Sequence, residues 1–224
     1  MMIHEKVLQW SAVVRGARRL TMIGVMGVCL LCGIGAPQAF AGAPTDSMKG
    51  TIDEVLRIIR DKELKEATKA EARRSQLEKA VAERFDYKEM SLRALGAPWK
   101  GLSDQEKQEF VTLFQDLLIS AYAKQIETYK GEGVKYLDER TYHSEQDGKE
   151  YAEVRTKILL EKTELPVDYR LINGGAEWHV YDVIMANTSL VQNYQKQFLS
   201  ILRKKSYHDL VEHLRETADK LKSR

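Results

Sequence analysis

The histidines are candidates for a functional site, because imidazole serves both as metal ligand and as general base. The chain has five, and only His208 and His213 lie near each other. A separation of five residues does not place both on one face of a helix, as the i, i+4 pair of a helical zinc site requires. The sequence therefore predicts surface histidines and no metal site.

Asp182 is the acid that best fits a catalytic base. It lies between Tyr181 and Val183 in an otherwise apolar run, and an apolar setting raises the pKa of a carboxyl toward the range useful for proton transfer. The alternative is a structural aspartate that is hydrogen-bonded to backbone or arginine, as buried polar groups usually are. No Gly-rich phosphate loop, G-x-S-x-G elbow or Cys-His arrangement points to a particular reaction.

The segment that holds Asp182 has the alternating pattern of a sheet. Four strands are predicted, over residues 134–142, 150–160, 167–172 and 178–185. The pairs Asp147-Gly148 and Asn173-Gly174 are typical of tight hairpins, because both residues of each pair accept positive φ. Consecutive strands should therefore pair antiparallel, as a meander.

Helices are predicted on both sides of this sheet in the sequence. Expected starts are a capping box at Thr51, a charged surface helix over 66–82, an N-cap at Asp86, a second capping box at Ser103, and further starts at Ser189 and Ser206. The helix from Ser103 should be the longest and should persist to Gly131. The order predicts an α+β fold, a twisted four-stranded antiparallel sheet wrapped by helices from both ends of the chain.

The N-terminus has the pattern of a secretory signal peptide over residues 1–41. Basic residues precede an apolar run over 20–34, which ends in the small-residue tripeptide Ala39-Phe40-Ala41. Both cysteines, Cys29 and Cys32, fall in this segment, so the mature chain would have no thiol, which fits an oxidising compartment. Residues 42–50 are expected to form a flexible leader, and 51–224 a single domain.

Charge argues against nucleic acid as a partner. The chain has 35 Lys and Arg against 33 Asp and Glu, and removal of residues 1–41 would bring the two nearly into balance. Phosphate binding needs a basic surplus on one face. Apolar stripes on the long helix, the strands and the helix from Ser189 should instead face one another, either as close-packed core or as the lining of a ligand cavity.

Two blocks of sequence resemble the MlaC family of periplasmic phospholipid-binding proteins associated with toluene tolerance. Residues 85–129 contain FD, M, LG and W in order, followed by LS-x-x-Q/E-x-x-x-F-x-x-x-F-x-x-LL. Residues 166–198 contain W-x-V-YDV followed by SLV-x-NY-x-x-QF. The resemblance implies an NTF2-like sheet with a deep apolar cavity for acyl chains, and a carrier instead of an enzyme.

The resemblance also implies the setting of such a carrier. Family members ferry phospholipid in the periplasm between an inner-membrane complex of an MCE-domain ring with an ABC transporter and an outer-membrane complex of lipoprotein and porin, which maintains outer-membrane lipid asymmetry. Phospholipid would be cargo and no cofactor is expected; a monomer suits a diffusing shuttle. Related members serve hopanoid biosynthesis, and an NTF2-like enzyme using Asp182 remains the alternative.

The expected lining of the cavity comes from the long helix, two strands and the helix after Ser189. The residues are Phe114, Leu117, Leu118, Tyr122, Val154, Ile158, Tyr169, Leu171, Leu190, Tyr194 and Phe198. Strand parity supports the choice for Val154 with Ile158 and for Tyr169 with Leu171. Two departures from the family pattern, Met-Ala-Asn-Thr at 185–188 without a Gly and Gln195 in place of a basic residue, concern loop geometry and partner contacts.

Overall fold

The computed structural model describes residues 43–175 and 177–222. These residues belong to one compact unit, Ala41–Arg224. The predicted signal peptide, with Cys29 and Cys32, lies outside the described residues.

The described chain is an α+β fold built on an antiparallel meander, as the sequence predicts. The sheet has the strand order β1-β2-β3-β4-β5, formed by β1 Val134–Ser144, β2 Lys149–Leu160, β3 Thr163–Asn173, β4 Trp178–Met185 and β5 Thr188–Ser189. The short β5, which pairs with the end of β4, is an addition to the four predicted strands.

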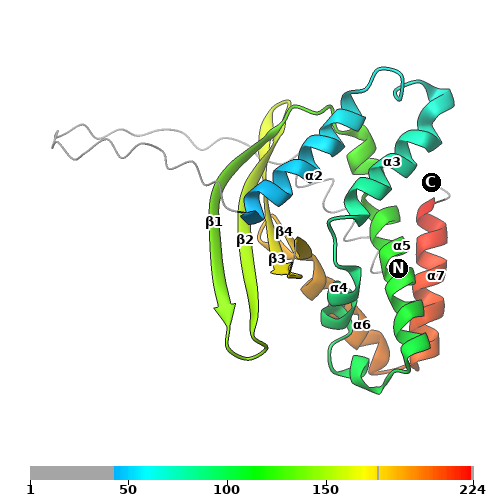
Figure 1. Cartoon of the computed structure of the whole chain (residues 1–224). Helices are drawn as coiled ribbons and strands as arrows, with labels where there is room; N and C mark the ends of the chain where they lie inside the picture. Colours follow the sequence, from blue (N-terminus) through cyan, green and yellow to red (C-terminus); the bar gives the residue numbers. More distant parts are fainter. Residues whose placement is uncertain (1–42, 176, 223–224) are drawn as a thin grey trace, which may run out of the picture. The chain divides into compact units, whose positions relative to one another are not determined.

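Six α-helices precede and follow the sheet in the described chain. They are α2 Ala43–Arg60, α3 Ala70–Ala82, α4 Tyr87–Leu95, α5 Asp104–Thr128, α6 Leu190–Leu202 and α7 Tyr207–Lys222, with 3-10 turns at Ala67–Lys69 and Ala97–Gly101. The labelled helices gather on one side of the sheet (Figure 1). Within the described residues, none of them has the length and apolar character needed to cross a bilayer.

Helix α2 begins earlier than the sequence suggests, so the expectation of a flexible leader over 42–50 is wrong from Ala43 onward. Met48 is 1% exposed within the main core, and the backbone N–H of Thr45 donates to Glu139 of β1 at 2.8 Å. The small, polar composition of this segment hides these contacts, which come from strands far along the chain. Thr51 lies inside the helix, and its hydroxyl donates to the carbonyl of Ser47.

The helix predicted over 66–82 begins later, at Ala70, without a side-chain cap, whereas the starts predicted at Asp86, Ser103 and Ser189 are confirmed by their caps. Ser103 and Glu106 form a reciprocal capping box at α5, and Asp86 accepts from the N–H of Glu89 at α4. Ser189 accepts from the N–H of Gln192 at α6. Each cap satisfies backbone donors that the first turn of a helix leaves free.

The turns of the meander are less uniform than their sequences suggest. Gly148 has φ of +67°, as its predicted turn requires. After β3 the positive φ falls on Gly175, whose N–H bonds the side chain of Asn173. Between β4 and β5 it falls on Ala186 and Asn187, so a turn without glycine connects the two strands.

One main core joins the sheet to the helices. The inward face of the sheet packs against α4, α5, α6 and α7, and Met48 of α2 belongs to the same cluster. Smaller clusters lie between α2 and α3, around Ile58 and Leu77, and on the other face of the sheet, around Tyr151 and Tyr181.

Candidate functional site

The inward face of the sheet is closed at one end. Ala152 and Val154 of β2 are fully buried, as are Leu171 of β3 and Val180 of β4. Register places Ala152 opposite Leu171, and Leu171 opposite Val180, in a continuous row across three strands. At this end the sheet and the helices pack as an ordinary protein interior.

The opposite end of the same face keeps accessible surface, and we call it the accessible end. It lies where β1 and β3 begin and where β2 and β4 end. Its residues are partly buried and pack against the main core: Tyr136, Ile158, Leu165 and Met185 from the strands, Tyr122 from α5, and Tyr169, which is paired with Val154 and lies at the border with the closed end. Ile158 is paired with Leu165, so apolar side chains continue to the end of the sheet.

Burial raises the pKa of the tyrosine hydroxyls at the accessible end. Desolvation raises the pKa of Tyr169 to about 12, and it also raises the pKa of Tyr122 well above its usual range. Neither phenol makes a hydrogen bond to another described residue. A tyrosine that keeps accessible surface while desolvation dominates its ionisation is surrounded by apolar groups and not by open solvent.

Aromatic rings fill the space between α5 and α6. Phe114 lies 5.2 Å from Tyr194 and 5.4 Å from Phe198, centroid to centroid, both edge to face. Phe110 adds a third edge-to-face contact with Phe198 at 5.6 Å. Such pairs add to the stability gained from burying the rings, so Phe114, Tyr194 and Phe198 already have close ring partners within the protein.

The structure brings all eleven residues of the predicted lining into one cluster. Eight of them are buried, namely Phe114, Leu117, Leu118, Val154, Leu171, Leu190, Tyr194 and Phe198. Tyr122, Ile158 and Tyr169 keep accessible surface. The sequence analysis did not include Tyr136, Leu165 and Met185, although alternation from Val167 indicates Leu165. A cavity bounded by these residues stays a prediction.

Asp182 is a buried anchor for the start of α6. It is 3% exposed, and it accepts the hydroxyl of Ser189 at 2.6 Å and the N–H of Val191 at 3.0 Å. The guanidinium of Arg170 lies 3.5 Å away. Both carboxylate oxygens are thus engaged with groups of the fold, which fits the structural alternative for this residue.

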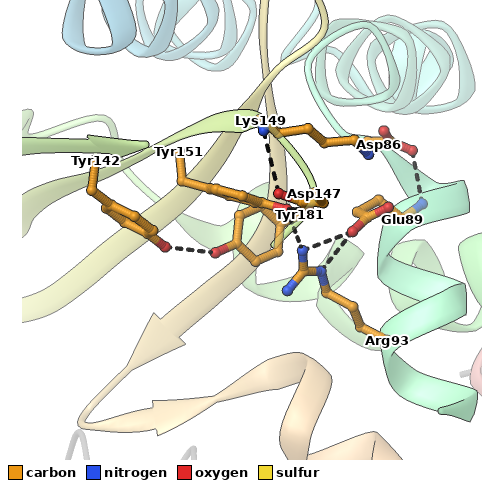
Figure 2. A network of polar contacts seen from close by, with 8 residues as sticks. All are labelled: Asp86, Glu89, Arg93, Tyr142, Asp147, Lys149, Tyr151 and Tyr181. Atoms are coloured by element: carbon orange, nitrogen blue, oxygen red, sulfur yellow. Dashed lines mark hydrogen bonds and ion pairs between the residues drawn. The ribbon is translucent and has the colours of Figure 1, made fainter. Parts of the chain in front are cut away.

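A polar and aromatic network lies away from the main core, at the junction of β1, β2, β4 and α4 (Figure 2). Arg93 lies over the ring of Tyr181 at 4.1 Å and bonds both Glu89 and the hydroxyl of Tyr151. Tyr151 in turn donates to Asp147 at 2.6 Å, which lowers the pKa of Asp147 to about 2. The donors and acceptors of this network pair with each other. The network therefore stabilises the attachment of α4 to the sheet.

Clusters of potential metal ligands are absent from the described part of the chain. Among residues 43–175 and 177–222, no three His, Cys, Asp or Glu side chains cluster as a metal ion would need. His208 and His213 both lie on α7.

Comparisons with known proteins agree on one family. Residues 49–216 match the model of the MlaC protein family. The intermembrane phospholipid transport system binding protein MlaC of Haemophilus influenzae is 23% identical over 130 residues, which make up 56% of this chain and 59% of that relative. The match therefore spans less than two thirds of the relative's length.

A solved structure has the same fold. The phospholipid-binding protein of Ralstonia solanacearum, determined in complex with a phospholipid, superimposes with a TM-score of 0.68 at 24% identity, over 80% of this chain and 99% of the other. At this identity the likeness concerns the fold. The family match covers most of the chain, including the helices and strands described above, and the chain therefore belongs to the MlaC family.

Proposed function

We propose that this protein is a phospholipid carrier whose acyl chains enter at the accessible end of the sheet. The observation that carries the proposal is the contrast along one sheet face, which is fully buried at Val154 and Leu171 yet accessible at Ile158. Membership of the MlaC family supports it, as do the phospholipid in the Ralstonia solanacearum structure and the name of the Haemophilus influenzae relative.

The energetic benefit of such a carrier is large. A diacyl lipid exposes roughly 30 methylenes, and at about 0.8 kcal/mol each its passage through water costs about 25 kcal/mol. A protein that covers both chains removes most of this barrier while the head group stays in solvent. This function needs no catalytic residue, which agrees with the engagement of Asp182 at the start of α6.

The proposed setting is the periplasm. The carrier would take up and release lipid at an inner-membrane MCE-domain and ABC transporter complex and at an outer-membrane lipoprotein and porin complex, and so maintain lipid asymmetry. The family assignment supports this setting. A monomer suits the role, because a shuttle between two membranes must diffuse.

Ile158→Trp with Val154→Trp as its matched partner tests the proposal. Both residues lie on β2 and face inward, but Val154 is fully buried and Ile158 is partly accessible. Tryptophan at 158 should occupy the space proposed for an acyl chain, so the purified protein should fold normally and carry less lipid. Tryptophan at 154 should overpack the closed end and destabilise the protein by about 1–3 kcal/mol.

Organic extraction followed by mass spectrometry measures the lipid, and circular dichroism with chemical unfolding measures the fold. Near-stoichiometric phospholipid in the wild type and a clear loss in Ile158→Trp are expected. Wild-type protein without lipid would contradict the carrier, and an unchanged lipid content in a folded Ile158→Trp variant would remove the accessible end from the proposal. A hopanoid in the extract would assign the chain to that branch.

A further inference from the structure

Tyr136 of β1 has a buried hydroxyl without a partner in the described residues. It faces inward, opposite Thr156 of β2. Burial, followed by the neighbouring phenol of Tyr169, raises the pKa of Tyr136. The register places Tyr169 near it on the same face, because Thr156 is opposite Val167 of β3 and Tyr169 follows Val167 by two residues.

Several tyrosines elsewhere in the fold use their hydroxyls in hydrogen bonds. Tyr151 donates to Asp147, Tyr129 to the carbonyl of Gly133, and Tyr207 to the carbonyl of Glu106. A phenylalanine would provide the same apolar ring as Tyr136 without a buried donor to satisfy. Since an unpaired buried hydroxyl costs free energy, the hydroxyl of Tyr136 indicates an acceptor that arrives with a ligand, and the phenol of Tyr169 can donate to the same ligand.

The polarity around this pair decides which acceptor fits. The ammonium of Lys49 lies 5.5 Å from the centre of the Tyr136 ring, and its side chain is 43% exposed. A charged phosphate stays where water and such a lysine reach it. Neutral carbonyl oxygens, which lie between the phosphate and the acyl chains of a glycerolipid, can enter further, to the depth of a buried hydroxyl.

We propose that Tyr136 and Tyr169 donate hydrogen bonds to the ester carbonyl oxygens of a glycerolipid bound at the accessible end. The proposal rests on the carrier function above and specifies the lipid class, one with ester-linked chains. Desolvated hydroxyl donors favour an ester carbonyl over an ether oxygen, which is the weaker acceptor. The same arrangement would set how deep the lipid sits, because the carbonyls stop where the hydroxyls are.

Paired lipids test the proposal directly. The full chain is produced and purified as wild type, Tyr136→Phe, Tyr169→Phe, the double variant, and Tyr142→Phe as control, because Tyr142 is 51% exposed and lies outside the main core. Each protein is depleted of lipid, and binding of a dioleoyl phosphatidylcholine and of its diether analogue is measured by competition with a fluorescent phospholipid. Thermal unfolding of each variant confirms the fold.

The wild type and Tyr142→Phe should bind the diester more tightly than the diether, and each interior substitution should weaken diester binding by about threefold to tenfold. The double variant should bind both lipids alike. Equal binding of both lipids by the wild type would overturn the ester assignment and leave the carrier intact. Equal weakening of both by the substitutions would place the contact on the phosphate instead, and binding of neither lipid would overturn the carrier itself.

Discussion

At the scale of single residues, the turn between β4 and β5 combines two left-handed positions without a glycine. Ala186 has φ of +46° and Asn187 has φ of +64°. Asparagine tolerates this region, whereas the Cβ of alanine crowds the following carbonyl. The turn keeps Ser189 beside Asp182, so the strain at Ala186 is held in place by the anchored start of α6.

Ala186→Gly should stabilise the protein. Relief of the left-handed strain should exceed the added flexibility of the unfolded chain and leave a net gain of about 0.5–1 kcal/mol. Chemical unfolding measures it, with Asn187→Gly as the control that should change stability less. A destabilised Ala186→Gly variant would show that the backbone there is not strained.

The phenol of Tyr169 predicts a sensitivity to alkali. Its pKa rises from the ordinary value of about 10 to about 12 in the folded chain. Because the folded pKa lies above the unfolded one, its contribution to stability is fully present below pH 10 and is lost as the pH rises through 10 to 12. Tyr169→Phe should therefore lose less stability between pH 9 and pH 11 than the wild type, measured by urea unfolding. An identical decline in both proteins would contradict this.

At the scale of elements, α2 shows how a distant contact extends a helix. Its first turns contain a threonine and a methionine that are buried, whereas Gly50 is exposed with open space around its Cα. The packing of these turns on the main core compensates for the low helix propensity of the sequence around Gly50.

Substitutions on two faces of α2 should change stability in opposite directions. Met48→Ala should destabilise the protein by about 2–4 kcal/mol because it leaves a space in the main core. Gly50→Ala should stabilise it by up to about 1 kcal/mol, because alanine favours a helix and meets no neighbour. Both are measured by chemical unfolding. If residues 43–50 were a flexible leader, neither change would matter.

Elements whose signals are local could be predicted from the sequence. The caps at Asp86, Ser103 and Ser189 each depend on residues within three positions, and the strands depend on simple alternation. The beginning of α2 could not be predicted, because it depends on Glu139 and the core.

The candidate site was predicted only in part, for a reason that lies in the strands. The register of the β1–β2 pair shifts between Tyr136 and Asp138. The register of the β3–β4 pair shifts between Arg170 and Leu171, where β4 has an extra residue. Each shift interrupts the two-residue alternation of the strand. The residues that face inward beyond the shift therefore cannot be predicted from alternation alone. In β4 both Val180 and Val183 belong to the main core although they are three residues apart, and Tyr136 was missed for the same reason.

At the scale of the whole molecule, the proposed cargo and the stability of the fold are coupled. The main core joins helices from both ends of the described chain to one face of the sheet, and the accessible end is the part of this face that the protein itself covers least. A lipid bound there, as proposed, would add apolar contacts to the folded state alone.

Removal of lipid should therefore lower the melting temperature. A ligand that binds only the folded state adds about 2.7 kcal/mol when present at a hundred times its Kd. Thermal unfolding of the purified protein before and after delipidation measures the shift, and re-addition of phospholipid should restore it. An unchanged melting temperature in protein shown to have lost its lipid would contradict the coupling.

Strand β1 is an edge strand of the sheet, and its register shift and charged residues oppose pairing with a strand of another molecule. A long, straight outer strand offers free backbone groups to a second chain and can seed fibrils. Here the shift between Tyr136 and Asp138 interrupts a regular template, and Asp138, Glu139 and Arg140 follow Leu137. The molecule should thus stay dispersed at high concentration, because an approaching strand would meet a kinked, charged border that it cannot extend.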